Sequence, residues 1–251
     1  MYSSPEEIKA AVDAYRARIA SHNRDTIEVV VPFVAAAQLE QESDLDSDDD
    51  GEDMNDLRVD SLASLLNDRI APYVSSPNDV LTRYEELVPI LGLDGVGTHE
   101  PDLLTDPDYV LQRDTYFSHL ERALKQKCLP EVCDIIAVPE EFRTLAEHAL
   151  VLTGPGLTEG SKSHQAMFWV GVLDEADDVA ELVLAPEGMR PLDGWECAAA
   201  WQPGGGFECP FNVVFCRRRG EEAGGRPQPW VWRYMVSSMD ERTAVFDTNY
   251  S

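Results

Sequence analysis

The spacing of apolar residues changes near residue 165, and this change most constrains the fold. Before it, apolar side chains recur every three or four residues, which is typical of amphipathic helices. After it come short β-rich runs bounded by Gly, Pro and Asp: AMFWVGVL, ELVLA, WECAAAW, FNVVFCR, WVWRYMV and TAVF. Helices followed by a series of strands predict an α+β fold, with a mostly antiparallel sheet packed against helices.

The start of the chain carries a helix signal. Ser4 can cap a helix, Pro5 suits the first helical position, and Glu7 completes a capping box. The next apolar stretch, TIEVVVPFVAAAQL, is open between strand and helix, because its β-branched half favours a strand and its alanine-rich half a helix. Further helices are expected near 58–71, near 78–91 with Gly92 after the end, from Asp106 and Pro107 onwards, and briefly from Pro139.

An acidic block separates these parts. Residues 40–56 read EQESDLDSDDDGEDMND and contain ten acidic residues and no basic one. Such a segment buries little apolar surface and repels itself, so it predicts a disordered linker. The expected division is an N-terminal helical arm at 1–40, an acidic linker at 41–56 and an α+β domain at 57–251.

The acidic block also contains two small motifs. Residues 46–51 match the first half of a calcium loop, but Leu57 stands where a bidentate Glu is required, so we expect no EF-hand. Ser43 and Ser47 each have an aspartate three residues later, a spacing that suits acid-directed kinases. Both serines are candidate phosphorylation sites.

The net charge limits the kinds of partner. The chain has 47 acidic and 20 basic residues, a net charge of −27. Nucleic-acid phosphates and anionic lipids repel such a chain, so we expect no nucleic acid and no membrane as partner, but proteins with basic surfaces. The first twenty residues lack the apolar core of a signal peptide, and no apolar run is long enough to span a membrane. The expected location is the cytoplasm, with the nucleus as the alternative.

The run VLTGPGLTEGSKS at 151–163 raises the question of phosphate binding. A P-loop needs GxxxxGK[ST] between a strand and a helix, so that backbone amides surround the phosphates. Here Gly156 and Gly160 are four apart, Ser161 precedes Lys162, and the following residues predict a strand. The run therefore favours a connection between helix and strand, with Gly154 as the helix stop.

Other catalytic signatures are missing. The five cysteines show no CxxC spacing, which indicates reduced thiols and disfavours a structural zinc site. The five histidines are scattered, and neither HExxH nor GxSxG occurs. We therefore expect no cofactor and no enzyme. The alternative is a hydrolase or nucleotide-dependent transferase that uses residues 154–163 and a histidine.

All five tryptophans lie in the β-rich part, at Trp169, Trp195, Trp201, Trp230 and Trp232. Core and cross-strand packing explains such residues in most sheets. An exposed aromatic stripe that binds a partner is the functional interpretation.

The run FSHLERALKQKCLPEVCDIIAVPEEFRTLAEHALVLTGPG, at 117–156, resembles the start of the SUKH superfamily, which includes fungal regulators of cell-wall synthesis and bacterial toxin-immunity proteins. In that family a helix contains a glutamate, a Pro-led motif opens a second helix, and a small-residue turn leads into a sheet. Glu121 matches the glutamate, VPEEF at 138–142 with Leu145 the Pro-led motif, and Gly154 and Gly156 the turn. Val138 replaces the usual Leu, and Thr153-Gly154 the usual Asn-Gly.

The resemblance covers about 110–250, where GWECAAAWQPGGG and WVWRYMV are similar to sheet strands of fungal members. It implies a non-enzymatic α+β module that binds other proteins. Absent catalytic motifs and the acidic composition favour the same function. We therefore expect a regulatory protein-interaction module. Its expected partner contacts are Glu140, Glu141, Trp230, Trp232 and Arg233, with acidic residues 42–56 attracting a basic partner.

Overall fold

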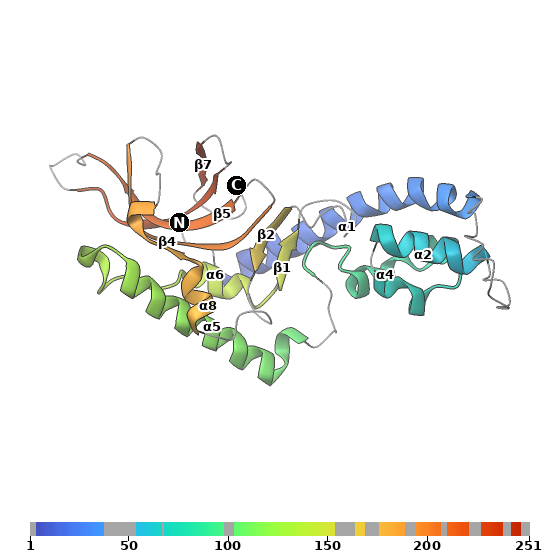
Figure 1. Cartoon of the computed structure of the whole chain (residues 1–251), viewed down its shortest axis with the longest axis horizontal. Helices are drawn as coiled ribbons and strands as arrows, with labels where there is room; N and C mark the ends of the chain where they lie inside the picture. Colours follow the sequence, from blue (N-terminus) through green and yellow to red (C-terminus); the bar gives the residue numbers. More distant parts are fainter. Residues whose placement is uncertain are drawn as a thin grey trace, which may run out of the picture. The chain divides into compact units, whose positions relative to one another are not determined.

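The computed structural model describes residues 4–37, 54–66, 68–97, 103–153, 164–168, 176–188, 194–206, 210–220, 227–237 and 242–246. The chain forms two compact units (Figure 1). One comprises Met1–Asp13, Asp102–Thr153 and Ser163–Ser251, and the other Ala14–Pro101 and Gly154–Lys162. Helix α1 (Pro5–Ala36) contributes residues to both.

The first unit contains the sheet. Its strands are β1 (Val151–Thr153), β2 (His164–Phe168), β3 (Val183–Leu184), β4 (Trp195–Gly206), β5 (Pro210–Arg218), β6 (Val231–Ser237) and β7 (Arg242–Phe246). In the part of the chain that is described, their order is β1-β2-β4-β5-β6-β7, with β3 paired to β4 and every pair antiparallel. The predicted α+β fold with an antiparallel sheet is confirmed.

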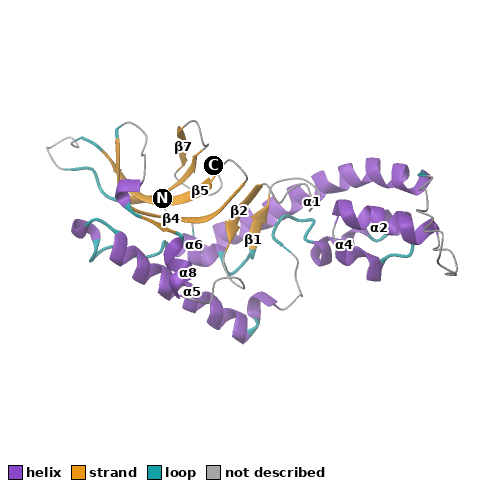
Figure 2. Cartoon of the chain, viewed as in Figure 1, coloured by secondary structure: helices purple, strands orange, loops and turns teal. Residues whose placement is uncertain are grey.

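Helices lie along one face of this sheet (Figures 1 and 2). They are α5 (Pro107–Lys127), α6 (Glu140–Leu145) and α8 (Ala176–Glu181). The first unit also contains the short helices η2 (Leu103–Thr105), η3 (Pro130–Val132) and η4 (Pro186–Gly188). Helix α5 starts where the sequence predicts, because the Asp106 carboxylate accepts hydrogen bonds from the Asp108 and Tyr109 amides. Lys127, at its end, donates to the Ala180 and Val183 carbonyls at 2.7 and 2.9 Å.

Strand β4 is longer than predicted and contains two bulges. Register shifts occur between Cys197 and Ala199 and between Trp201 and Gly204. The shifts free backbone groups from the ladder. The Ala198 carbonyl accepts from the Leu129 amide at 2.9 Å, and the Gln202 amide donates to the Leu182 carbonyl. The Ala198 bond therefore attaches β4 to the segment after α5, and the Gln202 bond extends the β3–β4 pairing by one residue pair.

The second unit is helical. It contains α1 from Ala14 onwards, α2 (Met54–Leu66), η1 (Asp68–Tyr73), α3 (Pro77–Thr82) and α4 (Tyr84–Leu91). Its apolar core combines Ile27 and Val31 of α1 with buried residues of all the later helices. The Asn23 amide donates to the Leu93 carbonyl and the Tyr84 hydroxyl to the Ala20 carbonyl, at 2.8 and 2.6 Å. Helix α4 ends at Leu91, and Gly92 follows it as predicted, with a φ of 68° that glycine adopts without strain.

The ambiguous stretch TIEVVVPFVAAAQL is helical as far as Ala36, and Pro32 lies inside the helix. Ile27 and Val31 are fully buried, whereas Val29 and Phe33 are 61% and 74% exposed. Burial at helical spacing therefore decides the structure here, against the strand preference of its β-branched residues.

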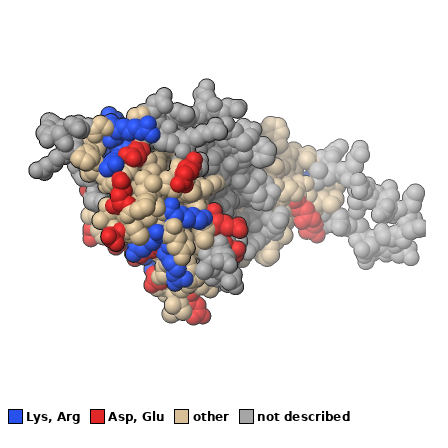
Figure 3. All heavy atoms as spheres, turned by 60° about the vertical axis from the view of Figure 1, so that its left-hand side comes forward, with Lys and Arg blue, Asp and Glu red and all other residues tan. Residues whose placement is uncertain are grey.

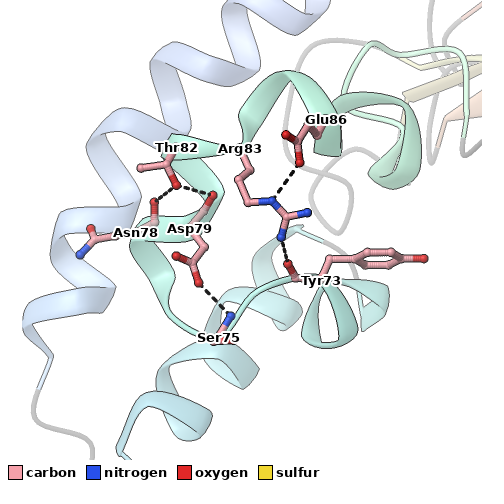
Figure 4. A network of polar contacts seen from close by, with 7 residues as sticks. All are labelled: Tyr73, Ser75, Asn78, Asp79, Thr82, Arg83 and Glu86. Atoms are coloured by element: carbon pink, nitrogen blue, oxygen red, sulfur yellow. Dashed lines mark hydrogen bonds and ion pairs between the residues drawn. The ribbon is translucent and has the colours of Figure 1, made fainter.

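The helix predicted near 78–91 is wrong in one respect, because Arg83 divides it into α3 and α4. Arg83 has φ −115° and ψ 20°, outside the helical region. Its guanidinium donates to the Tyr73 carbonyl and to Glu86, as Figure 4 shows. The Asp79 carboxylate accepts from the Ser75 amide in the same view, and also from the Ser76 amide, both at 2.9 Å.

Other boundaries also differ from the predictions. Residues 54–56, expected in the linker, form the first turn of α2, because their helix continues into the buried residues Val59 and Leu62. The helix predicted near 58–71 consists of α2 and η1. Strand β2 covers only the start of AMFWVGVL, whose residues after 168 lie outside the described part, and Glu181 of ELVLA ends α8. The two compact units have other bounds than the expected division at 1–40, 41–56 and 57–251, and that division stays a prediction.

We expect Asp79→Asn to lower the melting temperature at neutral pH. Hydrogen bonds from the backbone amides hold the pKa of Asp79 below its ordinary 3.8, and the Ser75 amide contributes more than the Ser76 amide. These bonds favour the charged carboxylate in the folded chain, so their stabilisation is present above that value and disappears as the pH falls through the lower folded pKa. Thermal unfolding of the wild-type and Asp79→Asn chains, from neutral pH down through the folded pKa of Asp79, measures the difference in melting temperature.

The matched control is Asp60→Asn, which removes the same charge from an exposed position of α2. A loss of stability as large in the control would contradict the capping role of Asp79.

Candidate interaction surface

Six aromatic rings form a continuous series through the first unit. We call it the aromatic ladder: Phe117 of α5, Phe142 of α6, Trp201 of β4, Trp232 of β6, Phe215 of β5 and Trp230. Successive ring centroids lie 6.1, 5.3, 5.1, 4.9 and 6.0 Å apart. The first three contacts are edge-to-face, which suits the charge distribution of the rings. The ladder therefore joins the helices to three central strands.

One end of the ladder is held by an arginine and a glutamate. The Arg143 guanidinium lies 4.8 Å from the Phe117 ring centre and 2.6 Å from an Oε1 of Glu121. The same oxygen accepts from the Val138 amide at 3.2 Å. Glu121, the glutamate of the SUKH resemblance, therefore fixes the residues that lead into α6.

The other end of the aromatic ladder is also held by an arginine and by glutamates. The Arg217 guanidinium lies 4.1 Å from the Trp230 ring and forms ion pairs with Glu131 at 3.1 Å and Glu196 at 2.8 Å. Its side chain is 21% exposed. Two carboxylates compensate the one cation, so the charge of Arg217 stabilises local structure.

A second tryptophan–arginine group lies on the opposite face of the same strands. Trp195 of β4 pairs in register with Arg218 of β5. The guanidinium groups of Arg218 and Arg233 lie 5.3 and 6.0 Å from the Trp195 ring. We call these three residues the Trp195 patch. Arg218 is exposed, and among the described residues it forms no ion pair with a carboxylate.

The Trp195 patch borders an apolar cluster. Trp195 and Leu184 pack against the buried residues Cys197, Ala200, Val214, Cys216 and Met235. The half-buried indole therefore offers apolar surface next to two guanidinium groups. This combination can bind a carboxylate and an apolar side chain together.

Basic residues gather at the end of β5, although the chain as a whole is acidic. Residues 217–219 are three consecutive arginines at the end of β5. On the face shown in Figure 3, lysine and arginine side chains form several clusters that alternate with acidic ones. The local charge of a surface, rather than the net charge of the chain, governs contact with a partner.

The structure brings only some of the predicted contact residues together. Trp230 and Trp232 both contact Phe215, within the ladder. Arg233 pairs in register with Val214 and lies on the opposite face of the sheet, beside Trp195. Successive side chains of a strand point to opposite faces, so Trp232 and Arg233 do not share a surface.

The two predicted glutamates differ in exposure. Glu140 is exposed, whereas Glu141 is 8% exposed, and its Oε1 has no hydrogen-bond partner among the described residues. Burial raises the pKa of Glu141 above its ordinary 4.5. Of the pair, only Glu140 is accessible to a partner in this conformation.

Several predicted features lie outside the described residues: Ser43, Ser47, the acidic residues 42–53, the Gly-rich residues 154–163 and Trp169. The sequence analysis named Trp195 only among the five tryptophans, without choosing it as a partner contact, and it did not name Arg217 or Arg218 at all. A usable signal was the three-arginine run directly after FNVVFC. Its pairing with Trp195 required the β4–β5 register.

Within the described ranges, no group of three or more His, Cys, Asp or Glu side chains is arranged to hold a metal ion. The helices of that same part include none with the length and hydropathy of a membrane span.

No model of a protein family matches the chain, and no curated protein and no solved structure matches it. The resemblance to the SUKH superfamily stays a prediction from the residues quoted for it.

Trp201→Ala is expected to destabilise the first unit strongly. Trp201 is fully buried between Phe142 and Trp232, and truncation of such a residue costs roughly 3–5 kcal/mol. Denaturant unfolding followed by circular dichroism measures the loss. Leu111→Ala, on the same unit's α5 but 66% exposed, is the control and should change stability by less than about 0.5 kcal/mol. Equal effects would contradict the ladder's role.

Glu141→Gln is expected to stabilise the chain at neutral pH. Because burial raises its pKa, the folded chain binds the Glu141 proton more tightly than the unfolded chain does. Wild-type stability therefore falls as the pH rises from 4.5 through the higher folded pKa, and the variant lacks this fall. Unfolding curves across this range should coincide at the acid end and separate above it. A variant less stable throughout would refute this account.

Proposed function

We propose that the chain is a non-enzymatic, intracellular protein-interaction module that binds an acidic segment of its partner at the Trp195 patch. The carrying observation is a half-buried tryptophan at the start of β4, flanked by two guanidinium groups. Tryptophan and arginine are the residues that most often dominate the binding free energy of protein interfaces.

The chemistry of the patch defines the partner segment. A guanidinium binds a carboxylate through two parallel hydrogen bonds, so Arg218 suits an aspartate or glutamate. The Trp195 ring and the adjacent apolar cluster suit a neighbouring apolar side chain. The partner segment therefore combines an acidic and an apolar residue.

The resemblance to the SUKH superfamily supports the proposal, because it implies a protein-binding module without catalysis. Regulation of a partner in the cytoplasm is the matching role. Acidic residues 42–56 would then attract a basic region of that partner, which adds to the rate of association.

Selection from a displayed random peptide library, with the full chain as bait, tests the proposal. We expect enriched peptides that carry Asp or Glu next to an apolar residue. Fluorescence polarisation with one enriched peptide then measures affinity. Trp195→Ala and Arg218→Ala should each weaken binding about tenfold or more.

Arg219→Ala is the matched control, because it removes the same charge from the next, exposed residue. It should weaken binding by less than about threefold, as expected for a charge at the rim of an interface. A library without acidic enrichment, or equal affinities of the Arg218 and Arg219 variants, would refute binding at the patch.

A further inference from the structure

Two cysteines converge at the end of α5. Cys128 follows the last helical residue, and Cys133 follows η3. Both thiols donate to a single acceptor, the Lys125 carbonyl oxygen, with sulfur–oxygen distances of 3.5 and 3.6 Å. Both side chains are half-buried thiols, within reach of small reagents.

The segment between the two cysteines is held in place by the rest of the first unit. The Leu129 amide donates to Ala198 of β4, and the Val132 amide to the Leu129 carbonyl. Glu131 forms its ion pair with Arg217. These contacts keep the two sulfur atoms near one another without a covalent bond.

We propose that Cys128 and Cys133 form a redox modification site, which low-molecular-weight disulfides convert reversibly to an intramolecular disulfide. In this reaction one protein thiolate attacks the sulfur–sulfur bond of glutathione disulfide. A mixed disulfide forms and one glutathione thiolate leaves. The second protein thiolate attacks the bound cysteine sulfur, the protein disulfide forms, and the second glutathione leaves. Two protein thiols are oxidised and one glutathione disulfide is reduced to two thiols.

The environment of the two thiols affects the rate of disulfide formation and its equilibrium extent in different ways. Burial, and then the neighbouring Cys133, raise the pKa of Cys128, so its reactive thiolate is scarce at neutral pH. Attack by Cys128 is therefore slow. Its equilibrium depends on how closely the fold holds the thiols, because the second step is intramolecular.

The disulfide would act on the segment that carries Glu131. A sulfur–sulfur bond of about 2.05 Å requires the thiols to move closer together than hydrogen-bonded thiols lie. Because Glu131 lies between the two cysteines, this movement would change its ion pair with Arg217. The proposal does not depend on the proposed binding function.

The test equilibrates the full-length chain in glutathione buffers of varied composition, then blocks free thiols by alkylation. Trypsin releases CLPEVCDIIAVPEEFR, residues 128–143, which contains both cysteines. Mass spectrometry separates the disulfide form, which lacks two hydrogens, from the doubly alkylated form. We expect a disulfide equilibrium constant about tenfold or more above that of the same chain in urea, and full reversal by dithiothreitol.

Two controls make the outcome specific. Cys133→Ser should accumulate the glutathione mixed disulfide at Cys128. Cys197 and Cys216, which are 8% and 1% exposed, should stay unmodified until the chain unfolds. A native constant at or below the urea value, or a link from Cys128 to another cysteine, would overturn the proposal.

Discussion

The contact series from Arg143 to Arg217 is the interaction on which the first unit depends. Between these arginines the aromatic ladder crosses from two helices to three strands, and each ring contact adds about 0.5–1.5 kcal/mol to simple burial. The carboxylates at the two ends, Glu121 and Glu131, lie on α5 and in the η3 helix just after it. One helix and its continuation therefore anchor both ends of the ladder.

Local sequence signals predicted the parts of the fold that local interactions determine. Asp106 starts α5 because its carboxylate caps the first amides of that helix, and the last four short β-rich runs form β4 to β7. Where distant contacts decide, the prediction was wrong or left two structures open. Arg83 interrupts a helix and bonds to a carbonyl ten residues earlier. Burial of Ile27 turns a β-branched stretch into helix.

The candidate surface was harder to predict than the fold, because it depends on strand register. The alternation of side chains separates Trp232 from Arg233, so a prediction that groups neighbours in sequence joins two faces. Trp195 and Arg218 are 23 residues apart, and only the pairing of β4 with β5 places them together. Composition indicated tryptophans in the sheet, but the register determines which of them form the core and which lie at its edge.

Arg217 and Arg218 show how one strand separates structure from recognition. The side chain of Arg217 meets two carboxylates and the last ring of the ladder, so its charge is compensated within the fold. Removal of a compensated cation leaves acids unpaired and costs stability. Arg218 points to the other face, where an exposed guanidinium beside Trp195 can exchange water for a partner's carboxylate at little cost to the fold. Adjacent residues of identical chemistry thus take different roles, because the strand turns one inward and the other outward.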